Sequence, residues 1–425
     1  MTRILVRSGK DPFDVVSPHV TLRDNVIGNN VGNLVFSNAV HKLLTTSRTD
    51  TVSTRFRADA RDAPQINAEF SAFAIPLANA FRPGFADALD RLSELIEKLT
   101  IPVVVVGVGA QATMGGRSRG GSDLERRVKR FASAVLDRSA TIGVRGEFTG
   151  EYLNTLGFRD VDVIGCPSLF MYGPNLRVEH GPASLDPAAR VALNISPYVS
   201  AMGPITMANE QQYPGLDYIA QDNRTLRLML TRIGPVRDNA APGMPVDTSH
   251  PLYRKHRMRF CVDPQTWFDL LRGYQFSFGT RIHGNIAAIL AGTPAMLLAH
   301  DSRTLELARY HEIPRRSVRK LPPDVRAADL YEQVDYTAFN AGHRARWEQF
   351  AAFLIRNGLP HVYEPGEDPS AFDARMAVTD FPAPVGVTSR AQAWMNRLRT
   401  DSPVRRLARR MLQRSDDQQP PPRGP

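Results

Sequence analysis

The feature that most constrains the fold is the alternation of short apolar runs with longer amphipathic stretches. The run IPVVVVGVG at 101–109 has no polar alternation, which is typical of a strand buried on both faces of a parallel sheet. Amphipathic stretches lie on either side of it, FADALDRLSELIEKLT at 85–100 and DLERRVKRFASAVLDR at 123–138. This order predicts an α/β fold in which helices flank a parallel sheet.

The same alternation starts again in the second half of the chain. We expect strands at 190–196, 257–263 and 274–280, a helix at 264–273, and a helix across 209–233 interrupted at Pro214. We also expect a strand across 160–172. Because 425 residues exceed one ordinary core, the pattern predicts two Rossmann-like domains, with a boundary in the Gly- and Pro-rich segment 173–189. The expected parts are an N-terminal domain at 1–175, a C-terminal domain at 186–335, a capping helix with its connection at 336–380 and a basic tail at 381–425.

The composition excludes several classes of protein. The two cysteines, Cys166 and Cys261, lack a CxxC partner, so we expect neither a disulfide scaffold nor a structural zinc site, and a reducing cytosol is the expected compartment. No apolar run is long enough to span a bilayer, and the first residues do not resemble a signal peptide. Of the net charge of +10, residues 381–425 carry +6, from nine Arg and three Asp. The remainder has no basic stripe interleaved with aromatics, so we expect no nucleic-acid partner.

The segment FGTRIHGNIAAILAGTPAMLLAHD at 278–301 combines a strand end, a turn, a helix and a second strand. Open α/β sheets bind ligands at the carboxyl ends of their strands, and a helix N-terminus there favours an anion. Arg281 adds a bidentate cation, and His283 adds a group that titrates near neutral pH. A neighbouring guanidinium is expected to lower the pKa of His283, and a bound anion to raise it again. A purely structural interpretation, in which Arg281 pairs with a carboxylate and His283 fills the turn, is equally consistent with the spacing.

The region 277–314, SFGTRIHGNIAAILAGTPAMLLAHDSRTLELARYHEIP, resembles the C-terminal signature of the polysaccharide pyruvyl transferases. Three shorter segments resemble other parts of that family: GNNVGNLVFSNAV, IPVVVVGVGAQA and GVRGEFTGEYLNTLG. The chain departs from the family pattern at several positions. Gly146 stands where an acidic residue is usual, Thr149 replaces Ser, Asn33 replaces Asp, Arg303 replaces Lys, and GCPS at 165–168 replaces Asp-Pro-Ala.

The resemblance implies two facing Rossmann-like domains of the glycosyltransferase-B type. It also implies transfer of the pyruvyl group of phosphoenolpyruvate onto two hydroxyls of a glycan sugar, which gives a ketal and phosphate. His283 would be the general acid, and the phosphoenolpyruvate would be held by Arg145, Arg281 and Arg303. Phosphoenolpyruvate is a co-substrate in this reading, and neither a cofactor nor a metal is expected.

Several alternatives and weaker candidates stay open. A nucleotide-sugar-dependent glycosyltransferase of the same architecture would also place cations over a diphosphate. Trp394, Leu398, Val404, Leu407 and Met411 lie at helical spacing opposite arginines, which fits either peripheral contact with an anionic membrane at its cytoplasmic face or a solvated, partly disordered extension. His300 and Asp301 are candidates for the rim of the site. The candidate substrate contacts are Asn30, Gly32, Asn33, Gln111 and Gly284.

Overall fold

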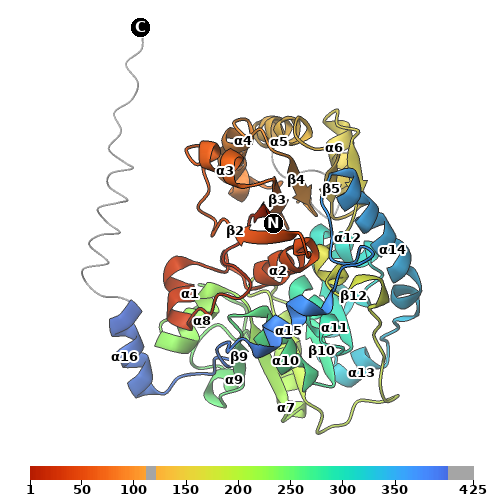
Figure 1. Cartoon of the computed structure of the whole chain (residues 1–425). Helices are drawn as coiled ribbons and strands as arrows, with labels where there is room; N and C mark the ends of the chain where they lie inside the picture. The colour runs from red at the N-terminus through yellow and green to blue at the C-terminus, as the bar shows by residue number, and fades with distance from the viewer. Residues whose placement is uncertain (112–120, 401–425) are drawn as a thin grey trace.

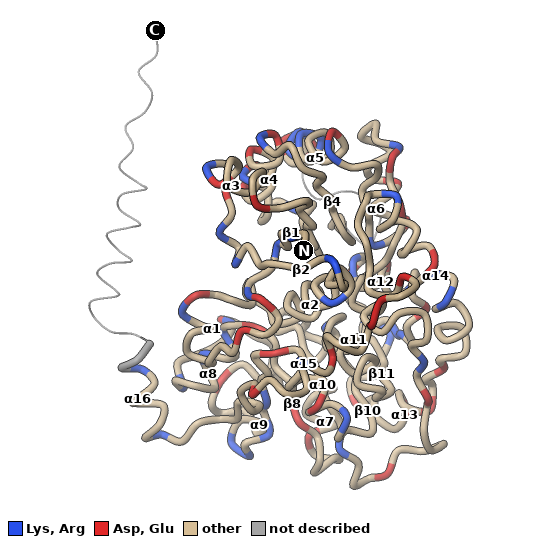
Figure 2. Tube along the Cα trace, in the orientation of Figure 1, with Lys and Arg blue, Asp and Glu red and all other residues tan. Residues whose placement is uncertain are grey.

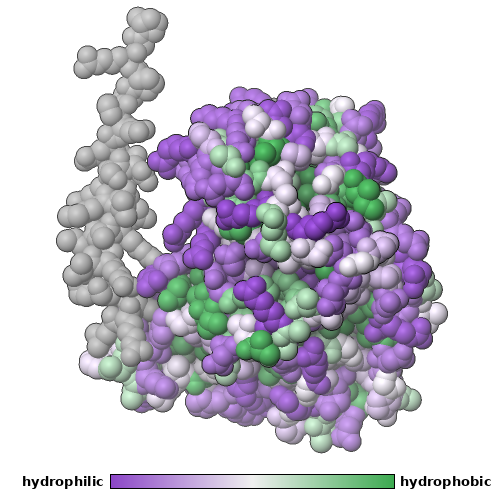
Figure 3. Space-filling view, viewed as in Figure 1, coloured by the Kyte–Doolittle hydropathy of each residue, from purple (hydrophilic) through white to green (hydrophobic). Residues whose placement is uncertain are grey.

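A computed structural model describes residues 1–111 and 121–400 of the chain. These residues form two α/β domains, which lie one above the other in Figure 1. Each domain is built on parallel strands, so the predicted α/β fold with two Rossmann-like domains is confirmed. On the face seen in Figure 3, hydrophilic residues cover most of the surface and hydrophobic residues form small separate patches. Within the described ranges, no helix is long and apolar enough to cross a membrane.

The N-terminal domain has a four-stranded parallel sheet in the order β2-β1-β3-β4 and a two-stranded parallel ladder, β5-β6. A parallel bridge between Val108 and Val144 joins the ladder to the sheet beside β4. The strands are β1 (Thr2–Val6), β2 (Thr49–Ser53), β3 (Ala72–Pro76), β4 (Val103–Val106), β5 (Ile142–Val144) and β6 (Val161–Val163). The helices are α1 (Pro18–Asp24), α2 (Gly32–Leu44), α3 (Ala63–Glu69), α4 (Ala86–Ile96), α5 (Gly121–Leu136) and α6 (Glu147–Thr155).

Strand β4 shows why its sequence lacks polar alternation. Successive side chains of a strand point to opposite faces. Val103 and Val105 belong to the core formed with α4 and α5, whereas Val104 and Val106 belong to the core formed with α2 and α14 (Thr337–Arg356). All four valines are buried, as predicted for a strand covered on both faces.

The C-terminal domain has a six-stranded parallel sheet in the order β12-β11-β10-β7-β8-β9. Its strands are β7 (Val191–Asn194), β8 (Leu216–Ala220), β9 (Met258–Phe260), β10 (Phe276–Gly279), β11 (Ala295–Ala299) and β12 (Arg315–Ser317). Its helices are α7 (Met202–Gln212), α8 (Asn223–Thr231), α9 (Pro251–Arg254), α10 (Pro264–Arg272), α11 (Ile282–Leu290), α12 (Ser302–Tyr310) and α13 (Ala327–Tyr331). The strand order reverses between β7 and β10, and sheets of this kind bind ligands outside the carboxyl ends at that point.

Two expected elements differ from the structure. The helix expected across 209–233 is two helices, α7 and α8, separated by strand β8. All five residues of β8 are buried between β7 and β9, so tertiary burial decides their conformation. The strand expected across 160–172 contains only β6, and a 3-10 helix follows at Pro167–Phe170. Pro167 lacks the N–H that a continuing ladder needs.

The last part of the chain packs back onto both domains. Helix α14 contributes Trp347, Phe350 and Phe353 to the core of the N-terminal domain. Helix α15 (Ser370–Val378) lies near α2, where Lys42 and Asp373 form an ion pair at 2.6 Å. Helix α16 (Arg390–Thr400) packs on α8 in the C-terminal domain.

The segment expected to be a basic tail is partly docked. Val385 pairs with Phe260 of β9, and the Thr388 hydroxyl donates to the carbonyl oxygen of Met229 in α8. The apolar residues of α16 differ in exposure, since Ala393 is buried whereas Trp394 is 60% exposed, and the expected contact of this helix with a membrane stays a prediction. Residues 401–425, with the expected helix around Val404, Leu407 and Met411, lie outside the described residues.

Candidate active site

A cleft of about 340 Å³ lies between the two domains, and loops from both domains line it. From the N-terminal domain come the segments that follow β3, β4, β5 and β6, together with the start of α2. From the C-terminal domain come the segments that follow β7, β8, β10 and β11. The cleft therefore lies at the carboxyl ends of both sets of strands, where α/β sheets bind ligands.

The hinge of the 278–301 segment forms one wall of this cleft. Gly279, the last residue of β10, has φ of +146°, and a Cβ there would lie 1.8 Å from the carbonyl oxygen of Asn194 in the neighbouring β7. Only glycine fits both conditions. The chain then turns into α11, where Arg281 is the N-cap residue and His283 lies in the first turn. The local sequence thus places Arg281 and His283 at the point where the strand order reverses.

His283 lies against the N-terminal domain. A Cβ on Gly32, at the start of α2, would lie 2.7 Å from the Cβ of His283, so the absence of a side chain at Gly32 permits this approach. The Phe36 ring meets the imidazole edge-on at a centroid distance of 6.0 Å, and the Cys166 Sγ lies 3.7 Å from Nε2. Burial, and to a lesser degree the Arg145 guanidinium, lower the pKa of His283 to about 3. The expected direction is right, but the neighbouring cation is Arg145 and not Arg281.

Arg145 follows β5 and reaches the cleft from the N-terminal domain. It is 6% exposed, and its Nε is buried without a hydrogen-bond partner among the described residues. A Cβ on Gly109 would lie 2.1 Å from that nitrogen, so only glycine leaves room for the guanidinium. Burial lowers the pKa of Arg145, and the nearby Glu306 carboxylate opposes this shift. The arginine nevertheless stays a cation at neutral pH, and its Nε is a buried donor without a partner among the described residues.

The other two predicted arginines are already paired with carboxylates. Arg281 Nη2 lies 3.3 Å from Asp222 Oδ2, and its Nε donates to the carbonyl oxygen of Ile195 at 3.1 Å. Arg303 Nε donates to Asp301 Oδ2 at 2.8 Å. Their positive charge is therefore partly compensated before any substrate binds.

Arg82 is a lining residue that the sequence analysis missed. It follows β3 and donates from Nε to the carbonyl oxygen of Asn79 at 2.9 Å. Burial and the charge of Arg303 lower its pKa, and no carboxylate pairs with it among the described residues. The available signal was the apolar run AFAIP at 72–76, which marks a buried strand whose carboxyl end leads to this arginine.

A carboxylate from the C-terminal domain compensates for the missing acid at Gly146. Gly146 is the N-cap residue of α6 and has no side chain to cap the helix. Glu306 of α12 takes this role: its Oε1 accepts from the Thr149 N–H at 2.8 Å and its Oε2 from the Thr149 hydroxyl at 3.2 Å. A Cβ on Gly146 would lie 2.3 Å from the Glu306 Cγ, so glycine makes room for this contact.

Only some of the expected substrate contacts line the cleft. Asn30 and Asn33 line the cleft, but both also hold the start of α2, since Asn30 Oδ1 accepts from the Gly32 N–H and Asn33 Nδ2 donates to the carbonyl oxygen of Ile27. Gly284 packs against Gln221 and Asn194.

Of Gln111, His300 and Asp301, only His300 lines the cleft. Gln111 donates its backbone N–H to Phe81 and is not among the residues that line the cleft. His300 lines the cleft, whereas Asp301 lines a neighbouring cavity.

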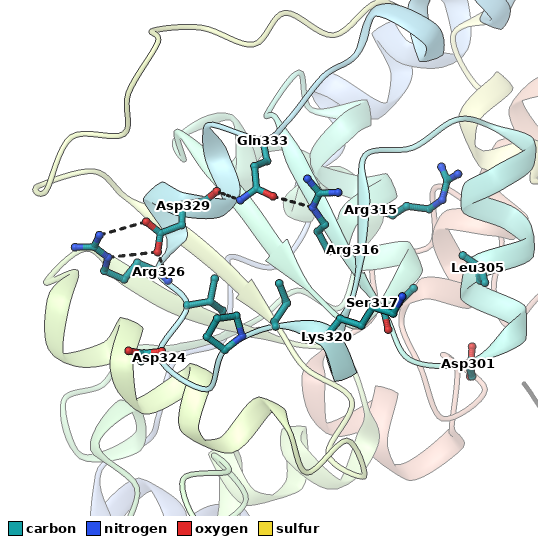
Figure 4. Close-up of a pocket in the computed structure, with 14 residues that line it drawn as sticks. Asp301, Leu305, Arg315, Arg316, Ser317, Lys320, Asp324, Arg326, Asp329 and Gln333 are labelled. Carbon is teal, nitrogen blue, oxygen red and sulfur yellow. Dashed lines mark hydrogen bonds and ion pairs between the residues drawn. The ribbon is translucent and has the colours of Figure 1, made fainter.

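That neighbouring cavity is larger, about 960 Å³, but it belongs to the C-terminal domain alone. Figure 4 shows that Arg326 is paired with Asp329 and that Arg316 is hydrogen-bonded to Gln333. We place the candidate site in the smaller cleft, because that cleft holds the histidine and both domains contribute to it. In residues 1–111 and 121–400, no cluster of His, Cys, Asp or Glu has the arrangement of a metal site.

Comparison with known proteins places the chain in a family. A family model described as polysaccharide pyruvyl transferase matches residues 81–302, which are 222 of the 425 residues. This match includes Arg82, Arg145, Arg281 and His283. No curated protein matches the chain.

Several solved structures resemble the chain weakly. An uncharacterized protein from Klebsiella pneumoniae is 12% identical, with 76% of this chain and 92% of that chain covered and a TM-score of 0.38. The UDP-GlcNAc 2-epimerase from Neisseria meningitidis, bound to UDP-GlcNAc, is 10% identical, with 84% and 100% covered and a TM-score of 0.40. Because the family match extends over more than half of the chain and reaches both walls of the cleft, this protein belongs to the polysaccharide pyruvyl transferase family.

Proposed function

We propose that this protein transfers the pyruvyl group of phosphoenolpyruvate onto two hydroxyls of a glycan sugar, within the cleft between the domains. The observation that carries the proposal is the meeting of His283 and Arg145 from opposite walls, with the buried Arg145 Nε lacking a partner in the described protein. A buried cation with an unused donor is costly unless a ligand completes it. A compact anion such as phosphoenolpyruvate fits that requirement.

The ion pairs divide the arginines into two groups. Arg145 and Arg82 have no carboxylate salt-bridge partner in the described chain, so they hold the phosphate and carboxylate of phosphoenolpyruvate most strongly. Arg281 and Arg303 share their charge with Asp222 and Asp301, and they orient the anion at the edge of the cleft. Cationic side chains supply the electrostatic stabilisation in this scheme, so the proposal requires neither a metal nor a cofactor.

His283 acts as the general acid. In the empty cleft its imidazole is neutral, since its pKa is lowered to about 3. A bound anion attracts the charged imidazolium directly and also offsets the field of Arg145, and both effects oppose the lowering of the pKa by burial, so the imidazole gains a proton when the substrate is present. His283 then donates this proton to the methylene carbon of phosphoenolpyruvate, and C2 becomes an oxocarbenium centre.

The two sugar hydroxyls attack in turn. The first hydroxyl adds to C2 and loses its proton. The bond from C2 to the phosphate oxygen then breaks, and inorganic phosphate leaves with the bonding electron pair. The second hydroxyl attacks C2, loses its proton and closes the ketal ring. One of the two hydroxyl protons returns to His283 and replaces the proton that it gave to the methylene carbon, and the other leaves with the phosphate.

The test combines binding and turnover. Calorimetry should show that the protein binds phosphoenolpyruvate and does not bind uridine or guanosine diphospho-sugars. Phosphate release and product mass on a panel of glycans should then show a pyruvate ketal, which His283→Ala abolishes. His180→Ala is the matched control, because His180 lies in the segment between the domains and bonds to the carbonyl oxygen of Tyr331. Binding of a diphospho-sugar without phosphoenolpyruvate would instead support the glycosyltransferase alternative.

A further inference from the structure

One corner of the C-terminal domain combines exposed apolar side chains with arginines. Helix α16 lies against the end of α8, where Asn396 Nδ2 donates to the carbonyl oxygen of Leu230 and Arg397 Nε to that of Thr231. The buried side of α16 includes Ala393 and Asn396. The opposite side of α16 faces away from the domain, at the lower left of Figure 1.

The outward side of α16 carries exposed apolar side chains as well as arginines. Trp394 is 60% exposed and Met395 is 48% exposed, and Ile233, just after α8, is 36% exposed. These are three of the eight exposed large hydrophobic residues in the described chain. Trp394 and Met395 are consecutive residues of α16, whereas exposed apolar residues on a soluble surface are normally scattered.

Arginines lie on α16 itself and at the ends of α8 and α9. Arg390 and Arg397 lie on α16, Arg254 ends α9, and the Arg232 guanidinium lies over the Tyr253 ring at 5.2 Å. Among the described residues, none of these four arginines has a carboxylate salt-bridge partner. Figure 2 shows Lys and Arg on α8, α9 and α16. Beyond Thr400 the sequence contains six Arg and three Asp, so the segment attached to this corner is also basic.

We propose that this basic corner, formed by Arg232, Ile233, Arg254, Arg390, Trp394, Met395 and Arg397, docks on the surface of an anionic membrane. Tryptophan favours the headgroup region of a bilayer, where its ring is partly buried. Arginines around it are attracted to anionic headgroups. A nucleic-acid duplex would account for the arginines, but its bases are stacked inside and leave Trp394 and Met395 without an apolar partner. The occupant that matches both features is a lipid surface.

The position of the corner connects it to the cleft. Helix α8 begins after Asp222, which lines the cleft and pairs with Arg281, and it ends beneath α16. Nine helical residues span about 13 Å. If the cleft carries the proposed pyruvyl transfer, a docked protein holds it close enough to the lipid surface for a glycan attached to a membrane lipid to reach it.

Co-sedimentation of the full chain with lipid vesicles tests the docking. The chain should sediment with vesicles of phosphatidylcholine and phosphatidylserine, but not with phosphatidylcholine alone. Changing Trp394 and Met395 together to Ser should remove most of this binding. Each of R254Q and R390Q should weaken it about fivefold. The matched control is Ile355→Ser, which changes an exposed apolar residue, 60% exposed, on α14 at the opposite side of the molecule in Figure 1.

The outcomes separate the two proposals. Unchanged sedimentation of the Trp394 and Met395 variant would overturn the docking surface, and so would equal binding to neutral vesicles. Binding to a DNA or RNA duplex in place of the vesicles would overturn it as well. The assay needs no turnover, so an absence of pyruvyl transfer leaves a positive lipid result intact. Circular dichroism of each variant shows whether the fold is retained.

Discussion

Glu306 is predicted to hold the N-terminus of α6 in place of the side chain that Gly146 lacks. Glu306→Ala removes both acceptors of Thr149 and leaves its backbone N–H and hydroxyl without this carboxylate. Loss of a helix cap costs about 1 kcal/mol, and a stranded buried polar group costs about 1–3 kcal/mol. Burial raises the pKa of Glu306, so the carboxylate also carries a cost of its own that the variant removes. We expect a net loss of about 2 kcal/mol in the free energy of unfolding.

The control places a serine at position 146, where the N-cap residue of α6 has no side chain. In the wild-type chain, Gly146→Ser should destabilise, because its Cβ would lie 2.3 Å from the Glu306 Cγ. In the Glu306→Ala background the same change should stabilise, since that carbon is absent and the serine hydroxyl can accept from the Thr149 N–H. The φ of Gly146 is −177°, an extended conformation that serine adopts freely. Urea unfolding of the four proteins measures the coupling, expected to be at least about 1 kcal/mol. Serine effects of equal sign in both backgrounds would refute the capping argument.

Three further predictions concern the cleft. Calorimetry at pH 6 in buffers of different ionisation enthalpy should show proton uptake when phosphoenolpyruvate binds, because the anion raises the pKa of His283 from about 3; the uptake should vanish in His283→Gln. Arg145→Gln and Arg82→Gln should each weaken phosphoenolpyruvate binding by about 1.5–3 kcal/mol, and Arg281→Gln by less, since Arg281 is already paired; equal effects in calorimetry would contradict this ranking. Gly32→Ala should displace His283, whose Cβ would lie 2.7 Å from the new methyl carbon; we expect turnover to fall while phosphoenolpyruvate affinity, measured separately, stays near wild type.

The hinge of the site could be predicted because its determinants are local. Gly279 ends a buried strand, Arg281 and His283 follow within four residues, and α11 begins at Ile282, one residue before His283. The strand-turn-helix pattern was therefore readable from neighbouring residues alone. Strand β8 was missed for the opposite reason. Its five residues sit between helical patterns, and only their burial between β7 and β9 makes them a strand.

The ion pairs of the site could not be predicted from the sequence. Arg281 is paired with Asp222, 59 residues away, and Glu306 caps a helix that contains Thr149, 157 residues away. Such distant contacts follow from how the two sheets face each other, which no short motif records. The predicted arginines all reach the cleft or its edge, but their ion pairs decide which of them has charge left for a ligand.

Contacts between the domains explain how Arg145 and His283 keep a fixed relation although they belong to different sheets. The Val31 N–H at the start of α2 donates to the carbonyl oxygen of Gln221 after β8, and the Cys166 N–H donates to His311 Nε2 at 2.8 Å. On another side, Lys10 and Asp263 form an ion pair at 3.1 Å with both side chains buried. Backbone bonds and buried ion pairs are costly to open, so these contacts favour a cleft that is assembled before the substrate arrives. A preassembled cleft is what the proposed chemistry needs, because the anion must meet the imidazole and the guanidinium together for the proton to be taken up.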